Sequence, residues 1–267
     1  MTGRQTLPSI SVAIVSCRGK PAIIRAFDSI KNQTGPFRLS VLVIGDNPNW
    51  APDELDDMRD SEIPLNVLAM TTDASWRRAP SVLRVARLRN IAIEYTEGDF
   101  ICFLDDDNAW QPDHLNSLFE AIMESGAEGA YSWRRLFMRD GTPWNQPTFP
   151  WGFDEQRKSE IYNALLRDGI MDRQNNIFRD DHSYRGLHKD LALVDMGSWL
   201  FRRTLLEKLR FETTYSDFDL RNSVTEDDKL LADINASGVH VICTRRPTLA
   251  YFLGGYSNMK ASEPKEA

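Results

Sequence analysis

Short apolar runs alternate with amphipathic segments through the first half of the chain, and this alternation constrains the fold more than any other feature. Apolar runs at 10–16, 37–44 and 65–70 predict strands, and apolar residues at helical spacing predict helices at 21–32 and 80–95. Strands and helices alternating in this way predict an α/β fold with a mostly parallel, doubly wound sheet. The chain has 267 residues, 42% of them hydrophobic, which is enough for one domain with a sizeable core.

The second half continues the pattern but includes one segment of different character. Residues 139–190 are rich in proline and aromatic residues, and apart from a predicted helix at 159–167 they are expected to be loop. A long loop in a compact domain is usually a lid, a binding loop or disordered, and the aromatic residues favour the first two. The remaining predictions are helices at 53–59, 114–124, 204–209 and 225–236, and strands from 129 to 133, 198 to 201 and 239 to 243.

The strand predicted at 100–104 runs directly into Asp105, Asp106 and Asp107. A short, β-prone apolar run predicts a buried strand, and ligands of open α/β sheets bind outside the carboxyl ends of such strands. No basic residue adjoins the triplet in the sequence, and adjacent carboxylates repel one another unless a cation or hydrogen-bond donors compensate. Their oxygens suit Mg²⁺ or Mn²⁺, often together with substrate phosphates. The alternative is a solvated acidic turn before the helix near Pro112.

Composition excludes several classes of protein. The formal net charge of −7 argues against bulk binding of nucleic acid. No stretch is long and uncharged enough for an integral membrane segment. The polar N-terminus lacks the pattern of a signal peptide, and Cys17, Cys102 and Cys243 show neither metal-site spacing nor a disulfide framework. These features predict a cytoplasmic protein.

An ordered set of motifs resembles the family 2 inverting nucleotide-sugar glycosyltransferases, which have the GT-A fold. Each motif is weak alone, but their order and separation match over nearly the whole chain. They are Ser11–Ser16 with Gln33-Thr34 after the next helix, Gly45-Asp46-Asn47, Ala86-Arg87-Leu88-Arg89-Asn90 before Gly98-Asp99, Phe103–Asp107 with Trp110 and Pro112-Asp113, Met196–Arg203, and Thr225–Asp228.

The resemblance implies transfer of a sugar from a nucleotide-diphospho-sugar to a sugar or other hydroxyl acceptor. It places Asp107 on a Mn²⁺ or Mg²⁺ that bridges the donor diphosphate, and Asp105 or Asp106 on the ribose or in the metal shell. It makes Asp227 the base that takes the acceptor proton. The alternative for Asp227 is a helix N-terminus enriched in acids that favour the helix dipole, as Glu226 beside it also fits.

The nucleotide pocket departs from the family pattern at one position. Members that bind uracil usually end the second strand with Asp followed by Asp or Asn, whereas this chain has Gly45 and then Asp46. Either Asp46 contacts the base or the base is not uracil, so a UDP-sugar is favoured while GDP- and TDP-sugars remain open. Ser16 and Arg18 follow the first strand, where the family contacts nucleobase and ribose.

Several arginines precede the Asp triplet in a chain that is otherwise acidic. Arginine suits a diphosphate because its planar fork binds two oxygens at once. Arg84 and Arg87 lie one helical turn apart and Arg89 points elsewhere, so Arg84 is the first candidate for the phosphates. A solvated helix face explains any single arginine equally well. The set is Arg77, Arg78, Arg84, Arg87 and Arg89.

The acceptor site is predicted only in outline. Asp195, Trp199 and Glu226 are the candidates, although Asp195 could equally cap its turn and a single Trp is more often part of the core. The resemblance divides the chain into a nucleotide-sugar-binding half, 1–108, and an acceptor-binding and catalytic half, 109–267. Two other functions stay open. A sugar nucleotidylyltransferase would need a glycine-rich loop after the first strand, and a non-catalytic binding protein would not need intact carboxylates.

Overall fold

The computed structural model describes residues 7–46, 51–59, 62–70, 74–152, 154–185, 193–222 and 224–254. Asn47 of the second motif and residues 153 and 186–190 of the predicted loop-rich segment lie outside these ranges. The first half runs through β1 (Ser9–Ser16), α1 (Lys20–Lys31), β2 (Arg38–Gly45), η1 (Pro52–Leu55), α2 (Asp56–Arg59), β3 (Leu65–Ala69), α3 (Ala74–Arg78), α4 (Ser81–Tyr95) and β4 (Phe100–Phe103).

The second half adds the strands that complete the sheet and the helices that cover it. Of the described strands, nine form one sheet in the order β3-β2-β1-β4-β8-β6-β9-β5, with β7 paired to β6 outside that path. The elements are β5 (Ala109–Trp110), α5 (His114–Ser125), β6 (Gly129–Phe137), α6 (Glu155–Arg167), β7 (Ile177–Phe178), η2 (Met196–Ser198), β8 (Trp199–Arg202), α7 (Arg203–Lys208), α8 (Asp217–Arg221), α9 (Glu226–Ser237) and β9 (Val241–Phe252).

The sheet is mixed but mostly parallel, which confirms the predicted α/β fold. Strands β3, β2, β1 and β4 are mutually parallel, β8 is antiparallel to both β4 and β6, and β6 is parallel to β9. Parallel neighbours end at the same edge, so the C-terminal ends of β1, β2 and β4 lie together. The Asp triplet therefore adjoins the residues that follow β1 and β2.

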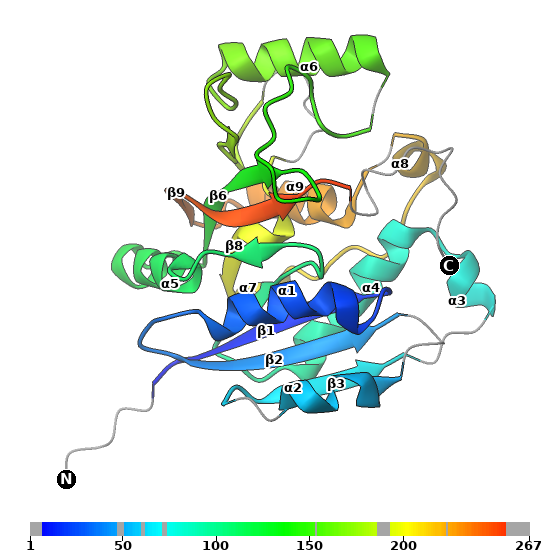
Figure 1. The fold of residues 1–267 in the computed structure, drawn as a ribbon, viewed down its shortest axis with the longest axis vertical. Helices are drawn as coiled ribbons and strands as arrows, with labels where there is room; N and C mark the ends of the chain where they lie inside the picture. Colours follow the sequence, from blue (N-terminus) through cyan, green and yellow to red (C-terminus); the bar gives the residue numbers. More distant parts are fainter. Residues whose placement is uncertain are drawn as a thin grey trace.

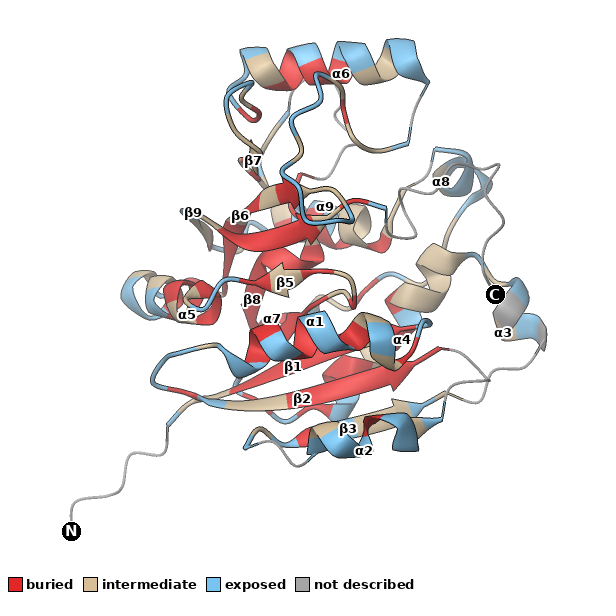
Figure 2. Cartoon of the chain, in the orientation of Figure 1, coloured by how far each residue is buried: buried red, intermediate tan, exposed pale blue. Residues whose placement is uncertain are grey.

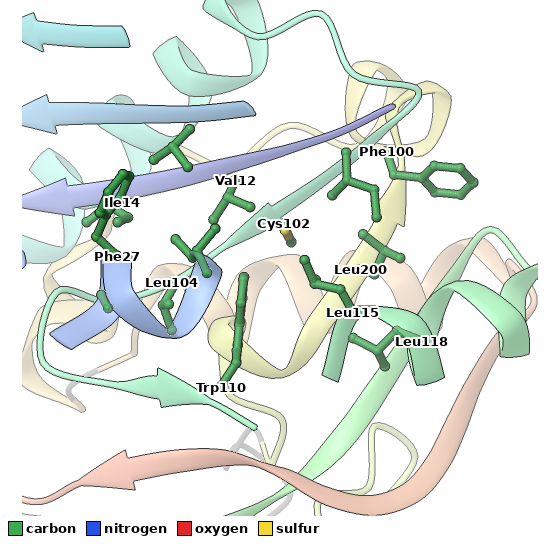
Figure 3. Packing of buried hydrophobic residues seen from close by; sticks show 14 of the residues in the cluster. Val12, Ile14, Phe27, Phe100, Cys102, Leu104, Trp110, Leu115, Leu118 and Leu200 are labelled. Atoms are coloured by element: carbon green, nitrogen blue, oxygen red, sulfur yellow. The ribbon is translucent and has the colours of Figure 1, made fainter. Parts of the chain in front are cut away.

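Strand β4 is buried on both faces, as its continuous apolar sequence predicts. Phe100 and Cys102 belong to one hydrophobic cluster, with α1 and α5, and Ile101 and Phe103 to a second, with α4, α7 and α9. Figure 3 shows the first cluster, in which Leu104 lies near Trp110. Burial on both faces fixes β4 in the sheet and so fixes the position of the carboxylates that follow it.

The described residues of the segment 139–190 are more ordered than the sequence predicts. Helix α6 begins at Glu155, four residues before the predicted start, and β7 pairs with β6. Apolar side chains from α6, β7 and the loops form a third hydrophobic cluster with Leu136 and Tyr251. Figure 1 shows α6 at one end of the molecule, away from the sheet, and Figure 2 shows its outer face exposed. The described part of the segment is therefore a small subdomain whose core is shared with β6 and β9.

Other differences concern short elements and strand length. Helices α3 and α8 and strands β5 and β7 are too short to give a periodic signal, and the sequence did not predict them. Strand β9 continues to Phe252, beyond the predicted end at Cys243, with shifts of register against β6 near Pro247. Among the described residues, no helix is long and apolar enough to cross a membrane.

Candidate functional site

The Asp triplet meets the loop after β1 at the edge of the sheet. Ser16 Oγ donates a hydrogen bond of 2.5 Å to Asp106 Oδ2, and the guanidinium of Arg18 pairs with Asp106 and lies 3.1 Å from Asp107 Oδ2. The triplet thus has a basic neighbour, contrary to the expectation from the sequence, because parallel pairing of β1 and β4 brings Arg18 to it. Ser16 and Arg18, which were predicted to contact the nucleobase and ribose, therefore lie against Asp106 of the triplet.

The three carboxylates differ in what they can bind. Both oxygens of Asp106 contact Ser16 or Arg18 and its side chain is only 8% exposed, so the structure does not fit its predicted contact with ribose or metal. The side chains of Asp105 and Asp107 are 41% and 24% exposed. Burial raises the pKa of Asp107, and Arg18 opposes that shift. Burial is the main cause that raises the pKa of Asp105, and the negative charge of Asp195 is the second. The positive charge of Arg89 lowers the pKa.

A divalent cation fits the chemistry of this edge, although no three His, Cys, Asp or Glu side chains of the described ranges converge as a preformed metal site. Asp105 and Asp107 offer exposed, hard oxygen donors. Mg²⁺ and similar ions are usually held by one or two carboxylates together with substrate phosphates and water. The donor set therefore suits a metal that arrives with a diphosphate.

The N-terminus of α9 carries the predicted base. Thr225 caps the helix: its Oγ1 accepts a hydrogen bond from the Asp228 backbone N–H, and its own backbone N–H donates to Asp228 Oδ2, which closes a capping box. Asp227 consequently lies in the first turn, with its side chain 19% exposed. Its Oδ2 accepts a hydrogen bond of 3.3 Å from the backbone N–H of Met196.

Arg89 joins the predicted base, Asp227, to the Asp triplet. Its guanidinium pairs with Asp227 and lies 3.0 Å from Glu226 Oε1 and 3.3 Å from Asp105 Oδ1. Only 5% of its side chain is exposed. Arg84 pairs with Asp46 and Arg89 with these carboxylates, so the two arginines do point to different groups; Arg89 was not among the predicted site residues. Arg89 belongs to the motif Ala86–Asn90, which this chain shares with the family that it resembles, and that motif could have identified it.

Two of the predicted acceptor contacts do not fit the structure. Trp199 is 1% exposed, with Phe201 stacked at 4.9 Å and Tyr131 at 4.6 Å, so it is a core residue and cannot stack on a sugar. Glu226 is 8% exposed and acts as a counter-ion of Arg89. Burial raises the pKa of Glu226 to about 7, and Arg89 opposes the shift.

The third predicted acceptor residue, Asp195, lies beside the base. It caps η2, because its Oδ1 accepts a hydrogen bond of 2.9 Å from the Gly197 N–H. Its Oδ2 lies 3.4 Å from Nη1 of Arg134. Burial raises its pKa, and Arg134 is the main opposing charge. The turn that Asp195 caps includes Met196, which donates to Asp227.

Asp46 and Arg84 form a second group at the end of β2. Arg84 Nη1 lies 3.0 Å from Asp46 Oδ2, and Trp76 Nε1 donates to Asp46 Oδ1 at 2.5 Å. The Asp46 N–H donates to the carbonyl of Ser16, which links this group to the triplet. Burial raises the pKa of Asp46, while Trp76 and Arg84 lower it. Trp76 was not predicted, because it lies on the short helix α3.

Comparison with known proteins agrees with this geometry. A family model described as glycosyl transferase family 2 matches residues 11–210. The putative teichuronic acid biosynthesis glycosyltransferase TuaG of Bacillus subtilis (strain 168) is 24% identical over 164 residues, which are 61% of this chain and 59% of TuaG.

Solved structures show the same fold. The crystal structure of S. aureus TarS 1–349 in complex with UDP-GlcNAc has a TM-score of 0.57 at 14% identity and covers 96% of this chain and 61% of TarS 1–349. The mannosyltransferase PcManGT from Pyrobaculum calidifontis, in complex with GDP-Man and Mn²⁺, has a TM-score of 0.57 at 16% identity and covers 95% of this chain and 59% of PcManGT. This chain spans about three fifths of the length of each of these relatives.

Proposed function

The chain belongs to glycosyl transferase family 2, and we propose that it is a metal-dependent, inverting enzyme that transfers a sugar from a nucleotide-diphospho-sugar to an acceptor hydroxyl. One observation carries the proposal. Arg89 holds the Asp227 carboxylate at the start of α9 and the Asp105 carboxylate after β4 at the same time. A single displacement at a sugar carbon requires a base and a diphosphate-binding edge that are held in fixed positions relative to one another.

The donor side of the site lies at the ends of β1, β2 and β4. Asp107 and Asp105 are the residues that would hold Mn²⁺ or Mg²⁺, and the structural relative PcManGT was solved in complex with Mn²⁺ and GDP-Man. Such an ion, when bound, stabilises the charge that develops on a departing nucleoside diphosphate. Arg18 can pair with a diphosphate in place of Asp107, because its side chain is 39% exposed.

Recognition of the nucleotide is assigned to the remaining residues of this edge. Ser16, Asp46 and Arg84 lie together there, and Arg84 is the further cation available to phosphate. These contacts support 1–108 as the nucleotide-sugar half and 109–267 as the acceptor and catalytic half. A UDP-sugar is favoured and GDP- and TDP-sugars are alternatives, in line with the complexes of the two structural relatives with UDP-GlcNAc and with GDP-Man.

Asp227 acts on the acceptor. The acceptor oxygen attacks the anomeric carbon, its proton passes to the Asp227 carboxylate, and the bond from that carbon to the diphosphate oxygen breaks. Attack from the face opposite the leaving group inverts the configuration. The Arg89 guanidinium and the Met196 N–H contact the two oxygens of Asp227 and orient this carboxylate for the step.

A donor screen tests the function. UDP-GlcNAc, UDP-glucose, GDP-mannose and TDP-glucose are each incubated with the protein and Mn²⁺, Mg²⁺ or EDTA, with water alone or with free sugars as acceptors. We expect nucleoside diphosphate release from one nucleotide class, abolished by EDTA, and a product of inverted anomeric configuration by NMR. Release of pyrophosphate from a nucleoside triphosphate and a sugar phosphate would indicate a nucleotidylyltransferase. Nucleotide binding without any turnover would indicate a binding protein.

A further inference from the structure

Arg134 on β6 is a buried arginine that contacts two carboxylates from separate parts of the chain. Its Nη2 lies 3.1 Å from Oδ1 of Asp180, and its Nη1 lies 3.4 Å from Oδ2 of Asp195. The exposed fraction of the side chain is 7% for Arg134, 0% for Asp180 and 11% for Asp195. Asp180 follows β7 in the 139–190 subdomain, whereas Asp195 belongs to the turn beside the base. Arg134 therefore links the subdomain to the catalytic half of the site.

Aromatic rings hold the Arg134 guanidinium in place. Its Cζ lies 4.7 Å from the ring centre of Phe178, 4.8 Å from that of Trp151 and 5.3 Å from that of Tyr251. Phe178 is also the register partner of Arg134 in the β6–β7 pair. A cation fixed by a strand, three rings and a buried carboxylate has little freedom to move. Any carboxylate that it pairs with is positioned by this subdomain.

The contacts continue from Asp195 to the base. Asp195 accepts hydrogen bonds from Gly197 through Oδ1 and from Ser198 through its carbonyl oxygen, both at 2.9 Å. These bonds shape η2, and Met196 inside that turn donates its N–H to Asp227 Oδ2 at 3.3 Å. Trp110 Nε1 donates to the Gly197 carbonyl at 2.7 Å and holds the other side of the turn. The turn is thus anchored at both ends while it presents one N–H to the base.

We propose that Arg134 is a positioning residue: it fixes Asp195 and the η2 turn, and through the Met196 N–H it orients the Asp227 carboxylate. Asp180 fixes Arg134 in turn, so the 139–190 subdomain contributes to catalysis through this chain of contacts. This inference rests on the proposed function, because it takes Asp227 to be the catalytic base. A lysine keeps the charge at position 134, but it has one ammonium and lacks the planar fork that reaches both carboxylates.

The test compares Arg134→Lys and Asp180→Asn with Arg203→Lys in the full chain. Arg203 is the matched control, because it donates to the carbonyls of Gly98 and Ile93 and to Thr96 Oγ1, outside the site. Hydrogen exchange of the Met196 amide is measured without ligand. We expect Arg134→Lys and Asp180→Asn to accelerate it about tenfold relative to amides of β1 in the same protein, and Arg203→Lys to leave that ratio unchanged.

Turnover supplies a second readout. Nucleoside diphosphate release from UDP-GlcNAc and from GDP-mannose is followed with Mn²⁺, and the stoichiometry of UDP and GDP binding counts the folded molecules. For Arg134→Lys we expect kcat per binding-competent molecule to fall by about tenfold or more with the donor KM within about twofold of the wild-type value, which is a loss of chemistry rather than of binding.

The outcomes separate this inference from the proposed function. An unchanged Met196 exchange ratio in both variants overturns the positioning role, whether or not either donor turns over. So does a rate loss that only follows the loss of nucleotide-binding sites, because Arg134 would then serve stability alone. If Asp227→Asn retains full turnover, the base assignment fails instead, even where Arg134→Lys alters the exchange of Met196.

Discussion

At the scale of single residues, one buried arginine organises the site. Arg89 is 4% exposed and its partners Asp105, Glu226 and Asp227 come from two elements far apart in the sequence. A buried charge is tolerated only when it is paired, so the arginine requires these carboxylates as much as they require it. The mutual requirement keeps the triplet and the base at a fixed separation.

Replacing Asp227 by Asn should separate binding from chemistry. Asn has nearly the same shape and can still accept the Met196 N–H, but it is a far weaker base. We expect the transfer rate to fall by about 10²–10⁴-fold, with little change in donor affinity. The rate and the donor dissociation constant are measured on one preparation, with Asp233→Asn, an exposed position on α9, as control. Equal losses of rate and affinity would move Asp227 to the metal site.

Replacing Asp107 by Asn should remove the metal dependence of nucleotide binding. In the proposed function the partly exposed carboxylate would be an oxygen ligand of the cation, and an amide is a much poorer ligand for a hard ion. We expect Mn²⁺ to strengthen UDP or GDP binding in the wild type and in Asp57→Asn, an exposed control on α2, but not in Asp107→Asn. Calorimetric titration with and without Mn²⁺ provides the measurement. A full Mn²⁺ response in Asp107→Asn would rule out the metal role.

At the scale of elements, the start of α9 is fixed by its capping box, and the chain offers a second capping box for comparison. Thr225→Ala removes the hydrogen bond to the Asp228 N–H and should cost about 1 kcal/mol of stability. Since Asp227 lies in the same turn, we also expect a loss of turnover of several-fold. Ser216→Ala at α8 removes the equivalent bond to Asp219 and should lower stability without lowering turnover. Equal turnover in the two variants would contradict the coupling.

The elements that the sequence predicted well are those whose burial or capping leaves a local pattern of residues in the sequence. Strand β4 is apolar throughout because both faces are covered, and the capping box of α9 is readable as Thr225 and Asp228. Arg89 could not be recognised as buried, because α4 has several arginines and the sequence does not show which of them lies against α9, Phe103 and Phe211. The contact between Arg18 and the triplet depends on the pairing of β1 with β4, which local patterns do not contain.

At the scale of the whole molecule, three hydrophobic clusters stabilise different parts of the structure. Two of them cover the faces of the sheet and hold α9 in place, and the third joins the 139–190 subdomain to β6 and β9. The sequence did not predict the third cluster, because its members come from α6, β6, β7, β9 and the loops between them rather than from one periodic segment. Residues such as Phe149, Phe178 and Leu193 meet only when β7 pairs with β6.

A single buried histidine should make the stability of the whole molecule depend on pH. His114, at the start of α5, is fully buried, stacks on Trp110 at 4.7 Å and contacts Thr248 Oγ1 through Nδ1 at 2.7 Å. Burial lowers its pKa from 6.5 to about 3. As the pH falls below 6.5, the unfolded chain binds a proton that the folded protein does not bind. The free energy of unfolding therefore decreases, and this loss continues until the pH reaches about 3.

His114→Gln cannot take up that proton, so the test compares slopes rather than absolute stabilities. Between pH 8 and pH 5, the wild type should lose about 2 kcal/mol more of its free energy of unfolding than His114→Gln does. The carboxylates titrate in both proteins, so their contribution cancels in the difference. Denaturant unfolding at a series of pH values gives the slopes, and His240→Gln, at an exposed position, is measured alongside as the matched histidine replacement. Parallel curves for the wild type and His114→Gln would show that His114 is protonated equally in the folded and unfolded states, and that burial beneath Trp110 does not keep it neutral.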